Sequence, residues 1–253
     1  MALIIAVTVV VAARGTWSPC GLSMLSTVTP LAERSRGHSF ARTAGWFVLG
    51  AVLGGTALGA AMATFAWALH YVGVQTSARL VVLALAALYA AAADARISFF
   101  RVPGIPRQVD ERWVDRYRPW VYGLGYGAQV GTGVATYVMT AGVYLVIVCA
   151  ALSANPAVAL FLGAVFGLTR GLCIFVGAGI TNPDRLRSVH DLLDRASPGS
   201  LATCVLAELA VWVTAVGIAF GAAGAGAAVV IALPVVVVAW SRVHADRSAE
   251  VVV

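Results

Sequence analysis

Long apolar stretches separated by short polar segments dominate the chain. A bilayer core of about 30 Å needs about 20 apolar residues in a helix, so each stretch of this length predicts a membrane span. The pattern predicts seven spans, near 2–31, 43–69, 76–93, 119–151, 155–180, 200–221 and 226–241, of which the seventh is the shortest. The predicted fold is therefore an all-α polytopic membrane protein.

The first apolar stretch, residues 2–13, has the length of the hydrophobic region of a signal peptide. No basic residue precedes it, and apolar and small residues resume after Gly15 and run to Leu31. We therefore interpret 2–31 as one broken span. A cleaved signal peptide is the alternative.

Composition supports a membrane protein, because 60% of the residues are hydrophobic and only 11% are charged, against about 25% in soluble domains. So few charged side chains cannot cover a soluble globule of this size, which excludes soluble enzyme folds. The mean hydropathy of +0.89 agrees.

The basic residues give a pI near 9.5, which by itself would suggest a nucleic-acid partner. All of them except Arg14, Arg79 and Arg170 lie in four connections: 32–42, 94–118, 182–199 and the tail after Trp240. The alternate connections are nearly uncharged. The positive-inside rule then places the N-terminus outside and the C-terminus in the cytoplasm of a multi-pass protein of the cell membrane. Topology accounts for the charge, and no nucleic-acid partner is expected.

An internal repeat links the two halves of the chain. Residues 49–56 (LGAVLGGT) match residues 162–169 (LGAVFGLT) at six of the eight positions. Weaker matches pair Gly15 with Gly125 and residues 82–84 with 205–207, in the same order along the chain. Because each unit holds three spans, the second enters the membrane from the opposite side. We predict a first repeat at 1–95, a cytoplasmic loop at 96–118, a second, inverted repeat at 119–222, and an additional span and tail at 223–253.

Inverted repeats place the working site near the midplane, where broken helices of the two halves meet. Pro19 and its neighbouring glycines interrupt the first span, and five glycines between 123 and 133 mark the corresponding part of the fourth. Most of these glycines are expected to serve close helix packing. The side chains expected to line a polar cavity between the two spans are Arg14, Trp17, Ser18, Pro19, Met24, Tyr126, Gln129, Thr132 and Thr136.

Cys20 is the residue with the clearest chemical potential. It follows Pro19 where the first span resumes, and a rise of about 1.5 Å per residue places it close to the midplane. A cysteine at a helix N-terminus can be a reactive thiol, whereas an apolar cysteine packed at a kink is the structural alternative. Cys20 and Met24 could offer soft sulfur ligands, but without a third ligand no metal site is predicted.

The segment 15–25 (GTWSPCGLSML), followed by Pro30 and a short basic loop, resembles the first span of the CcdA and DsbD membrane-domain family, to which MauF-like members are also similar. These proteins are thiol-disulfide relays in cytochrome c biogenesis and extracytoplasmic reduction. The resemblance covers the layout of six spans, and its specific motif is the Ser-Pro-Cys-Gly stretch. It implies thiol redox transfer through Cys20 as the catalytic residue, with a thioredoxin-like protein as the partner and no cofactor.

The sequence departs from that family at the second cysteine. Each family repeat supplies one cysteine, but the repeat alignment puts Gln129 and Val130 opposite Pro19 and Cys20. Cys149 is expected near the outer end of its span, and Cys173 and Cys204 near the cytoplasmic ends of theirs. We therefore expect no second sulfur within the Cα separation of about 6 Å that a disulfide with Cys20 requires.

Three charged residues fall inside spans, where each costs at least about 2.5 kcal/mol unless it has a partner or a wet cavity. Arg170 and Glu208 are expected to form a structural ion pair between the fifth and sixth spans. Arg14 has no evident acidic partner, and it either lines a site or reaches the membrane surface by snorkelling.

Three functions fit these features. The first is a CcdA-like redox protein that acts through Cys20 and a partner. The second is an alternating-access transporter of a small solute or metal ion, which would keep its function in a Cys20→Ser variant. The third is a non-catalytic subunit of a larger complex. The sequence has no zinc-ligand spacing, phosphate loop or catalytic triad order, and it leaves open whether the protein is an enzyme.

Overall fold

The computed structural model describes residues 1–97, 99–102 and 112–250, and for residues 240 and 242–250 the backbone alone. All secondary structure in these ranges is helical, which confirms an all-α polytopic membrane protein. The elements are α1 (Ala2–Arg14), η1 (Gly15–Trp17), α2 (Pro19–Thr27), α3 (Pro30–Ser35), α4 (Phe40–Val72), α5 (Thr76–Asp94), α6 (Trp113–Arg116), α7 (Pro119–Thr132), α8 (Gly142–Leu152), α9 (Pro156–Leu172), η2 (Cys173–Gly179) and α10 (Pro183–Glu250).

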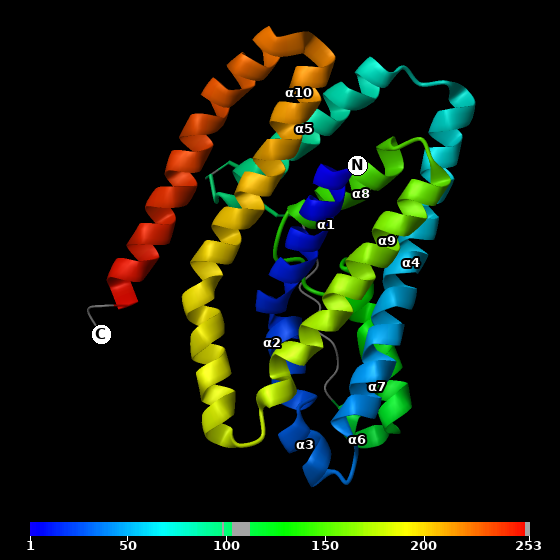
Figure 1. Cartoon of the computed structure of the whole chain (residues 1–253), viewed down its shortest axis with the longest axis vertical. Coiled ribbons are helices and arrows are strands. Elements are labelled where there is room, and N and C mark those ends of the chain that lie inside the picture. The colour runs from blue at the N-terminus through cyan, green and yellow to red at the C-terminus, as the bar shows by residue number, and fades with distance from the viewer. Residues whose placement is uncertain (98, 103–111, 251–253) are drawn as a thin grey trace.

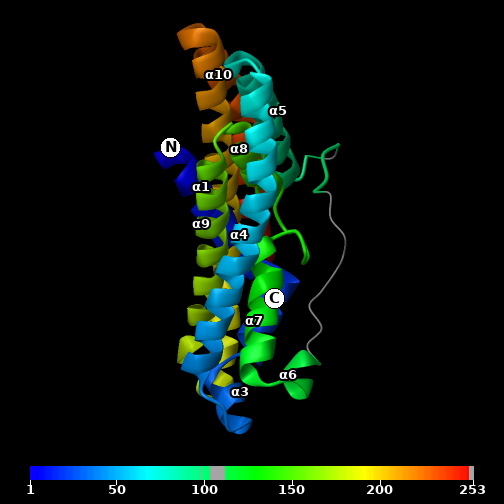
Figure 2. The ribbon, with the colours of Figure 1, turned by 90° about the vertical axis from the view of Figure 1, so that its right-hand side faces the viewer.

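In the described part of the chain, four helical stretches are long and apolar enough to cross a membrane. These are α4, α5, α9 continued by η2, and α10. A bent pair formed by α1–η1 and α2 makes a fifth, with an angle of 67° between its two parts. The predicted fourth span is divided into α7 and α8, neither of which is long enough to count alone. Turned by 90°, the long helices run along the long axis of the molecule (Figure 2).

Several helices begin with the same local signal, a capping side chain followed by proline. The side-chain oxygens of Ser18, Thr29 and Asn155 accept hydrogen bonds from backbone N–H groups in the first turns of α2, α3 and α9. Asn182 does the same for the N–H of Arg185 in α10, at 2.8 Å. Proline at the first helical position fits because its missing N–H would have no partner inside the helix. The boundaries of these helices are therefore encoded locally.

The last helical stretch, α10, turns back on itself. Gly221 has φ 75° and ψ −167°, outside helical geometry, and it divides α10 into two antiparallel arms (Figure 1). The first arm holds the predicted sixth span, and the second holds the predicted seventh span. Buried residues of the second arm, among them Ala228, Ala232 and Val235, join the main hydrophobic cluster with residues of α5.

The centre of the molecule is α4, which packs closely on both α7 and α9. A Cβ atom on Gly55 would lie 2.7 Å from Cα of Gly167 and would collide with the carbonyl of Gly163. A Cβ on Gly163 would in turn collide with the carbonyl of Gly55. On the other side of α4, a Cβ on Gly127 of α7 would collide with the carbonyl of Phe47. These residues belong to the predicted repeat motif or to the glycine-rich stretch, and here they allow backbones to touch.

The connections between the helices lie at the two ends of the molecule (Figure 1). The α3 region, α6 and the turn before α10 lie at one end, whereas the α4–α5 turn, the α8–α9 turn and the bend of α10 lie at the other. This grouping agrees with the predicted alternation of Arg-rich and uncharged connections. Residues 98 and 103–111 of the predicted loop 94–118 lie outside the described residues. The inverted repeats, their boundaries and the orientation in the membrane stay predictions.

Candidate functional site

The break in the first span is built by Ser18. Its Oγ donates to the Gly15 carbonyl at 2.7 Å and accepts from the N–H of Gly21 at 3.1 Å, so one side chain closes both sides of the break. Gly21 is required because a Cβ there would be 2.8 Å from the Gly15 carbonyl oxygen. The expectation that Ser18 lines a cavity therefore gives way to a capping role.

Cys20 lies in the first turn of α2 and is only 1% exposed. It packs in a hydrophobic cluster whose other members include Met24, Tyr126 and Val130. Val130 is the residue that the repeat alignment placed opposite Cys20. None of the four cysteines, all of which lie among the described residues, forms a disulfide.

Arg170 occupies the space opened by the break. Its Nε donates to the carbonyl of Val130 at 3.1 Å, and a Cβ on Gly15 would overlap its guanidinium. The guanidinium carbon is 6.0 Å from the ring centroid of Phe166. Glu208 lies beside Cys204 and Asp94, and the expected Arg170–Glu208 ion pair is not found among the contacts of the described residues.

Cys173 begins η2, directly after α9. Its Sγ contacts the carbonyl of Thr169 at 3.2 Å, and its side chain is partly exposed. Cys173 lines one small cavity together with Met24, Arg170 and Gly21, the residue that follows Cys20. Two thiols therefore lie close to one cationic group at the break of the first span.

A larger cavity of about 640 Å³ lies between the broken parts of spans one and four. The residues that line it are Trp17, Pro19, Leu22, Arg96, Val102, Tyr137, Val138 and Met139. Trp17 and Pro19 were expected to line a cavity, and the structure places them here. The residues from the fourth span follow the glycine-rich stretch and do not belong to it.

The interruption of the fourth span lies further along the chain than expected. Residues 123–132 are helical, and the non-helical segment begins at Gly133 (φ 70°) and ends before Gly142. The polar residues that were expected to line one cavity are therefore divided between α7 and the non-helical segment. Gln129 and Thr132 are half-buried on α7, where Thr132 Oγ1 donates to the Gln129 carbonyl at 2.8 Å. Thr136 is buried in the non-helical segment, and its Oγ1 has no hydrogen-bond partner among the described residues.

Arg14, at the end of α1, is buried rather than snorkelling. It donates to the Ser197 carbonyl at 3.0 Å and to the hydroxyl of Ser200, both in α10. The guanidinium carbon lies 5.6 Å from the ring centroid of Trp17. Ser200 lies one helical turn before Cys204, so Arg14 is held on the part of α10 that carries the buried acidic cluster described next.

Asp94, Cys204 and Glu208 form a buried cluster beside the break in the fourth span. Asp94 Oδ1 accepts from the N–H of Ala141 at 2.7 Å, and Asp94 Oδ2 accepts from the hydroxyl of Thr140. Cys204 Sγ lies 3.8 Å from Asp94 Oδ2 and 3.7 Å from Glu208 Oε1. Ligand-type atoms of the three side chains lie within 4.8 Å of one another.

Sequence reasoning missed this cluster. Asp94 ends an apolar stretch and was assigned to the following loop, and Cys204 was expected near the cytoplasmic end of its span. The long first arm of α10 instead begins at Pro183, which places Cys204 well inside the helix. A carboxylate directly at the end of an apolar helix was the signal that could have indicated Asp94.

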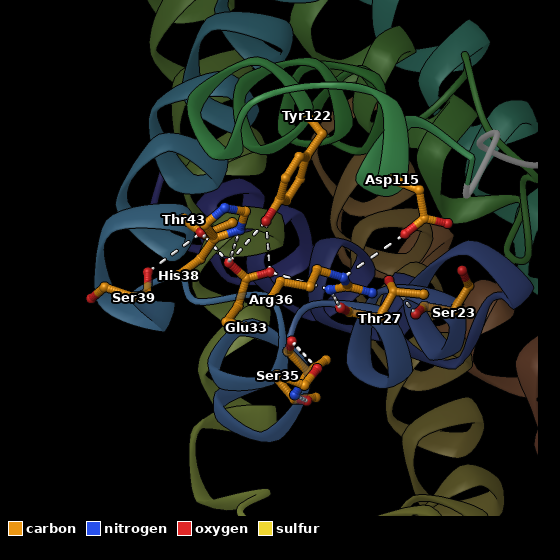
Figure 3. Close-up of polar contacts among 12 residues, drawn as sticks. Ser23, Thr27, Glu33, Ser35, Arg36, His38, Ser39, Thr43, Asp115 and Tyr122 are labelled. Atoms are coloured by element: carbon orange, nitrogen blue, oxygen red, sulfur yellow. Dashed lines mark hydrogen bonds and ion pairs between the residues drawn. The ribbon is translucent and has the colours of Figure 1, made fainter.

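A second buried polar network lies around Glu33 of α3 (Figure 3). Tyr122 of α7 donates its hydroxyl toward both carboxylate oxygens of Glu33, at 2.7 and 2.8 Å. Thr43 of α4 donates to Oε2 at 2.6 Å, and Arg36 lies 3.4 Å from Oε1. Glu33 is fully buried. The network joins the connection after the first span to α7 in the other half of the chain.

The chain has homologues among proteins named methylamine utilization protein MauF. It is 37% identical over 168 residues to that of Paracoccus versutus, which covers 64% of this chain and 59% of the relative. For MauF of Paracoccus denitrificans the identity is 32% over 171 residues, 64% of this chain and 59% of the relative. For MauF of Methylorubrum extorquens the identity is 32% over 176 residues, which cover 68% of this chain and 60% of the relative.

No family model matches the chain. No solved structure matches it either. The resemblance to CcdA and DsbD stays an expectation. The chain spans about three fifths of the length of the curated relatives it matches, and over this part it is similar to proteins named for methylamine utilization.

Proposed function

We propose that the chain is a cell-membrane accessory protein for methylamine utilization and that it transfers reducing equivalents through a thiol pair formed by Cys20 and Cys173. The homologues named MauF support the first part. The observation that carries the second part is the position of both thiols around the Arg170 guanidinium at the break of the first span. Cysteines that exchange disulfides are typically flanked by such a cationic group.

The two thiols have different accessibility, which assigns them different steps. Cys173 is partly exposed, whereas Cys20 is 1% exposed. The Cys173 thiolate attacks the disulfide of a thioredoxin-like partner, which forms a mixed disulfide and releases one partner thiolate. Cys20 then attacks Cys173 Sγ, which forms the Cys20–Cys173 disulfide and releases the second partner thiolate. Two electrons pass to the partner, and the protons of the two thiols end on the partner's thiols.

The small cavity between the two residues is where the second step takes place. It is lined by Gly21, Met24, Arg170 and Cys173, and Cys20 precedes Gly21, so the step requires η2 and α2 to approach each other across this cavity. A dithiol of a second thioredoxin-like protein reduces the pair by the reverse sequence. This proposal departs from two expectations drawn from the sequence: that Cys20 itself receives the partner, and that no second sulfur can reach Cys20.

Trapping the mixed disulfide tests the proposal. The Cys20→Ser variant is expected to accumulate a mixed disulfide between Cys173 and a thioredoxin-like protein, because the second step is blocked. Cys173→Ser is expected to form none. Cys149→Ser, a buried cysteine in a different cluster, is the matched control and should behave as the unaltered protein.

Growth on methylamine gives a second readout. We expect the chain to restore growth of a Paracoccus versutus strain that lacks its own MauF, and Cys20→Ser and Cys173→Ser to fail. If both variants restore growth and no mixed disulfide forms, the thiol proposal is wrong. An alternating-access transporter would then be favoured, since a cavity of about 640 Å³ lies between the two broken spans.

A further inference from the structure

The buried cluster of Asp94, Cys204 and Glu208 has the features of a cation site. It lies apart from the Cys20–Arg170 region and takes no part in the proposed thiol exchange. Its members come from α5 and from the first arm of α10, and the broken fourth span supplies Thr140 against them. Asp94 is 4% exposed, and Cys204 and Glu208 are fully buried.

The distances fit a tetrahedral metal ion. Around Zn²⁺, with a Zn–S distance of about 2.3 Å and a Zn–O distance of about 2.0 Å, a sulfur and an oxygen ligand lie about 3.5 Å apart. The Cys204 sulfur is 3.8 Å from Asp94 Oδ2 and 3.7 Å from Glu208 Oε1. The three side chains therefore stand close to ligand geometry without any rearrangement of helices.

An unused carboxylate oxygen points to a ligand. Glu208 Oε2 is buried and has no hydrogen-bond partner among the described residues. Leaving a carboxylate oxygen without a partner inside a membrane protein is costly unless something binds it. Gly142 leaves room for this carboxylate, since a Cβ there would lie 2.6 Å from Glu208 Oε1.

The charges also balance with a divalent cation. Two carboxylates and one thiolate carry three negative charges, and the Arg14 guanidinium is hydrogen-bonded to Ser200, one helical turn before Cys204. A cation of charge two together with Arg14 makes the cluster neutral, which removes most of the cost of burying it. A thiolate among carboxylates suits Zn²⁺ and similar transition ions, whereas Mg²⁺ and Ca²⁺ require oxygen ligands throughout.

We propose that Asp94, Cys204 and Glu208 bind one divalent transition-metal ion of the Zn²⁺ type at the break of the fourth span, with Thr140 beside the remaining coordination position. Access is from the cavity of about 640 Å³, which is lined by Arg96, two residues after Asp94, and by Met139, the residue before Thr140. The site was absent from the sequence predictions because Asp94 is more than 100 residues away from Cys204 and Glu208 along the chain.

Metal titration of the full chain in detergent tests the site. Co²⁺ is the probe, because a thiolate ligand gives a Co²⁺ charge-transfer absorption that oxygen ligands do not give. We expect one Co²⁺ per chain with this absorption, and its displacement by Zn²⁺. Cys204→Ser should abolish the absorption, and Glu208→Gln should weaken binding by about tenfold or more. Cys20→Ser and Cys149→Ser are matched controls that should bind as the unaltered protein does.

A second measurement avoids dependence on variants. In the unaltered protein, Zn²⁺ is expected to slow alkylation of Cys204 by a membrane-permeant maleimide at least about tenfold while leaving Cys149 unchanged, as measured by mass spectrometry. Absence of the thiolate absorption together with equal Cys204 alkylation with and without Zn²⁺ would overturn the proposal. The cluster would then be a pair of carboxyl groups that share a proton.

Discussion

Replacing Tyr122 with Phe removes the hydroxyl that donates to Glu33 and leaves the aromatic ring in place. Both residues are fully buried, so no water can substitute for the lost donor. The hydroxyl has one proton, shared between carboxylate oxygens at 2.7 and 2.8 Å, and therefore counts as one hydrogen bond to a charged group. Such bonds contribute about 1.5–3 kcal/mol.

Because Thr43 and Arg36 still contact Glu33 in the variant, the expected loss is near the middle of this range, about 2 kcal/mol. That loss is a decrease of about 30-fold in the ratio of folded to unfolded protein. Reversible unfolding in mixed micelles of a mild detergent and dodecyl sulfate measures it. Tyr89→Phe is the matched control: Tyr89 is 43% exposed and donates to the carbonyl of Arg101, so its loss should be below about 0.5 kcal/mol.

A double-mutant cycle of Tyr122→Phe and Glu33→Gln isolates the pairwise energy. A coupling energy near zero, or a Tyr122→Phe variant as stable as Tyr89→Phe, would refute the conclusion that this hydrogen bond joins the two halves of the chain.

Two further predictions concern packing and orientation. Gly55→Leu is expected to lower the free energy of unfolding by about 1–3 kcal/mol or more, because its side chain would force α4 away from Gly163, whereas Gly45→Leu on the same helix meets open space and should be neutral in the same assay. A cysteine at Ser35 is expected to stay unlabelled by an impermeant maleimide added to intact cells, and a cysteine at Ser77 to be labelled; the reverse pattern would contradict the predicted topology.

Local sequence signals predicted the position of the break in the first span, whereas tertiary packing determines the position of the break in the fourth span. Ser18 and Pro19 encode a helix start within a few residues, and the structure has a 67° bend there. The glycine-rich stretch of the fourth span stays helical because residues such as Gly127 pack on α4, and the break follows where this contact ends at Gly133. Sequence alone shows which residues can break a helix, but a neighbouring helix decides which of them do.

For the buried charged residues too, the sequence predicted their burial, but helix packing determines their partners. Hydropathy located Arg14, Arg170 and Glu208 inside the membrane, and all three are buried. Their partners depend on which helices are adjacent, and that is set by side-chain shape across the whole bundle. The sequence therefore predicted that these charges need partners, but it did not predict that Asp94 lies beside Glu208.

The backbone contacts of α4 also have a mechanical consequence. At several glycines of α4, α7 and α9 the backbones of neighbouring helices touch directly, so sliding one helix past another would drive carbonyl groups into Cα atoms within a fraction of a turn. The three helices consequently form a stiff block. Any movement that opens a path to Cys20 has to displace α2 or the helices packed beside it, while α4 stays in place.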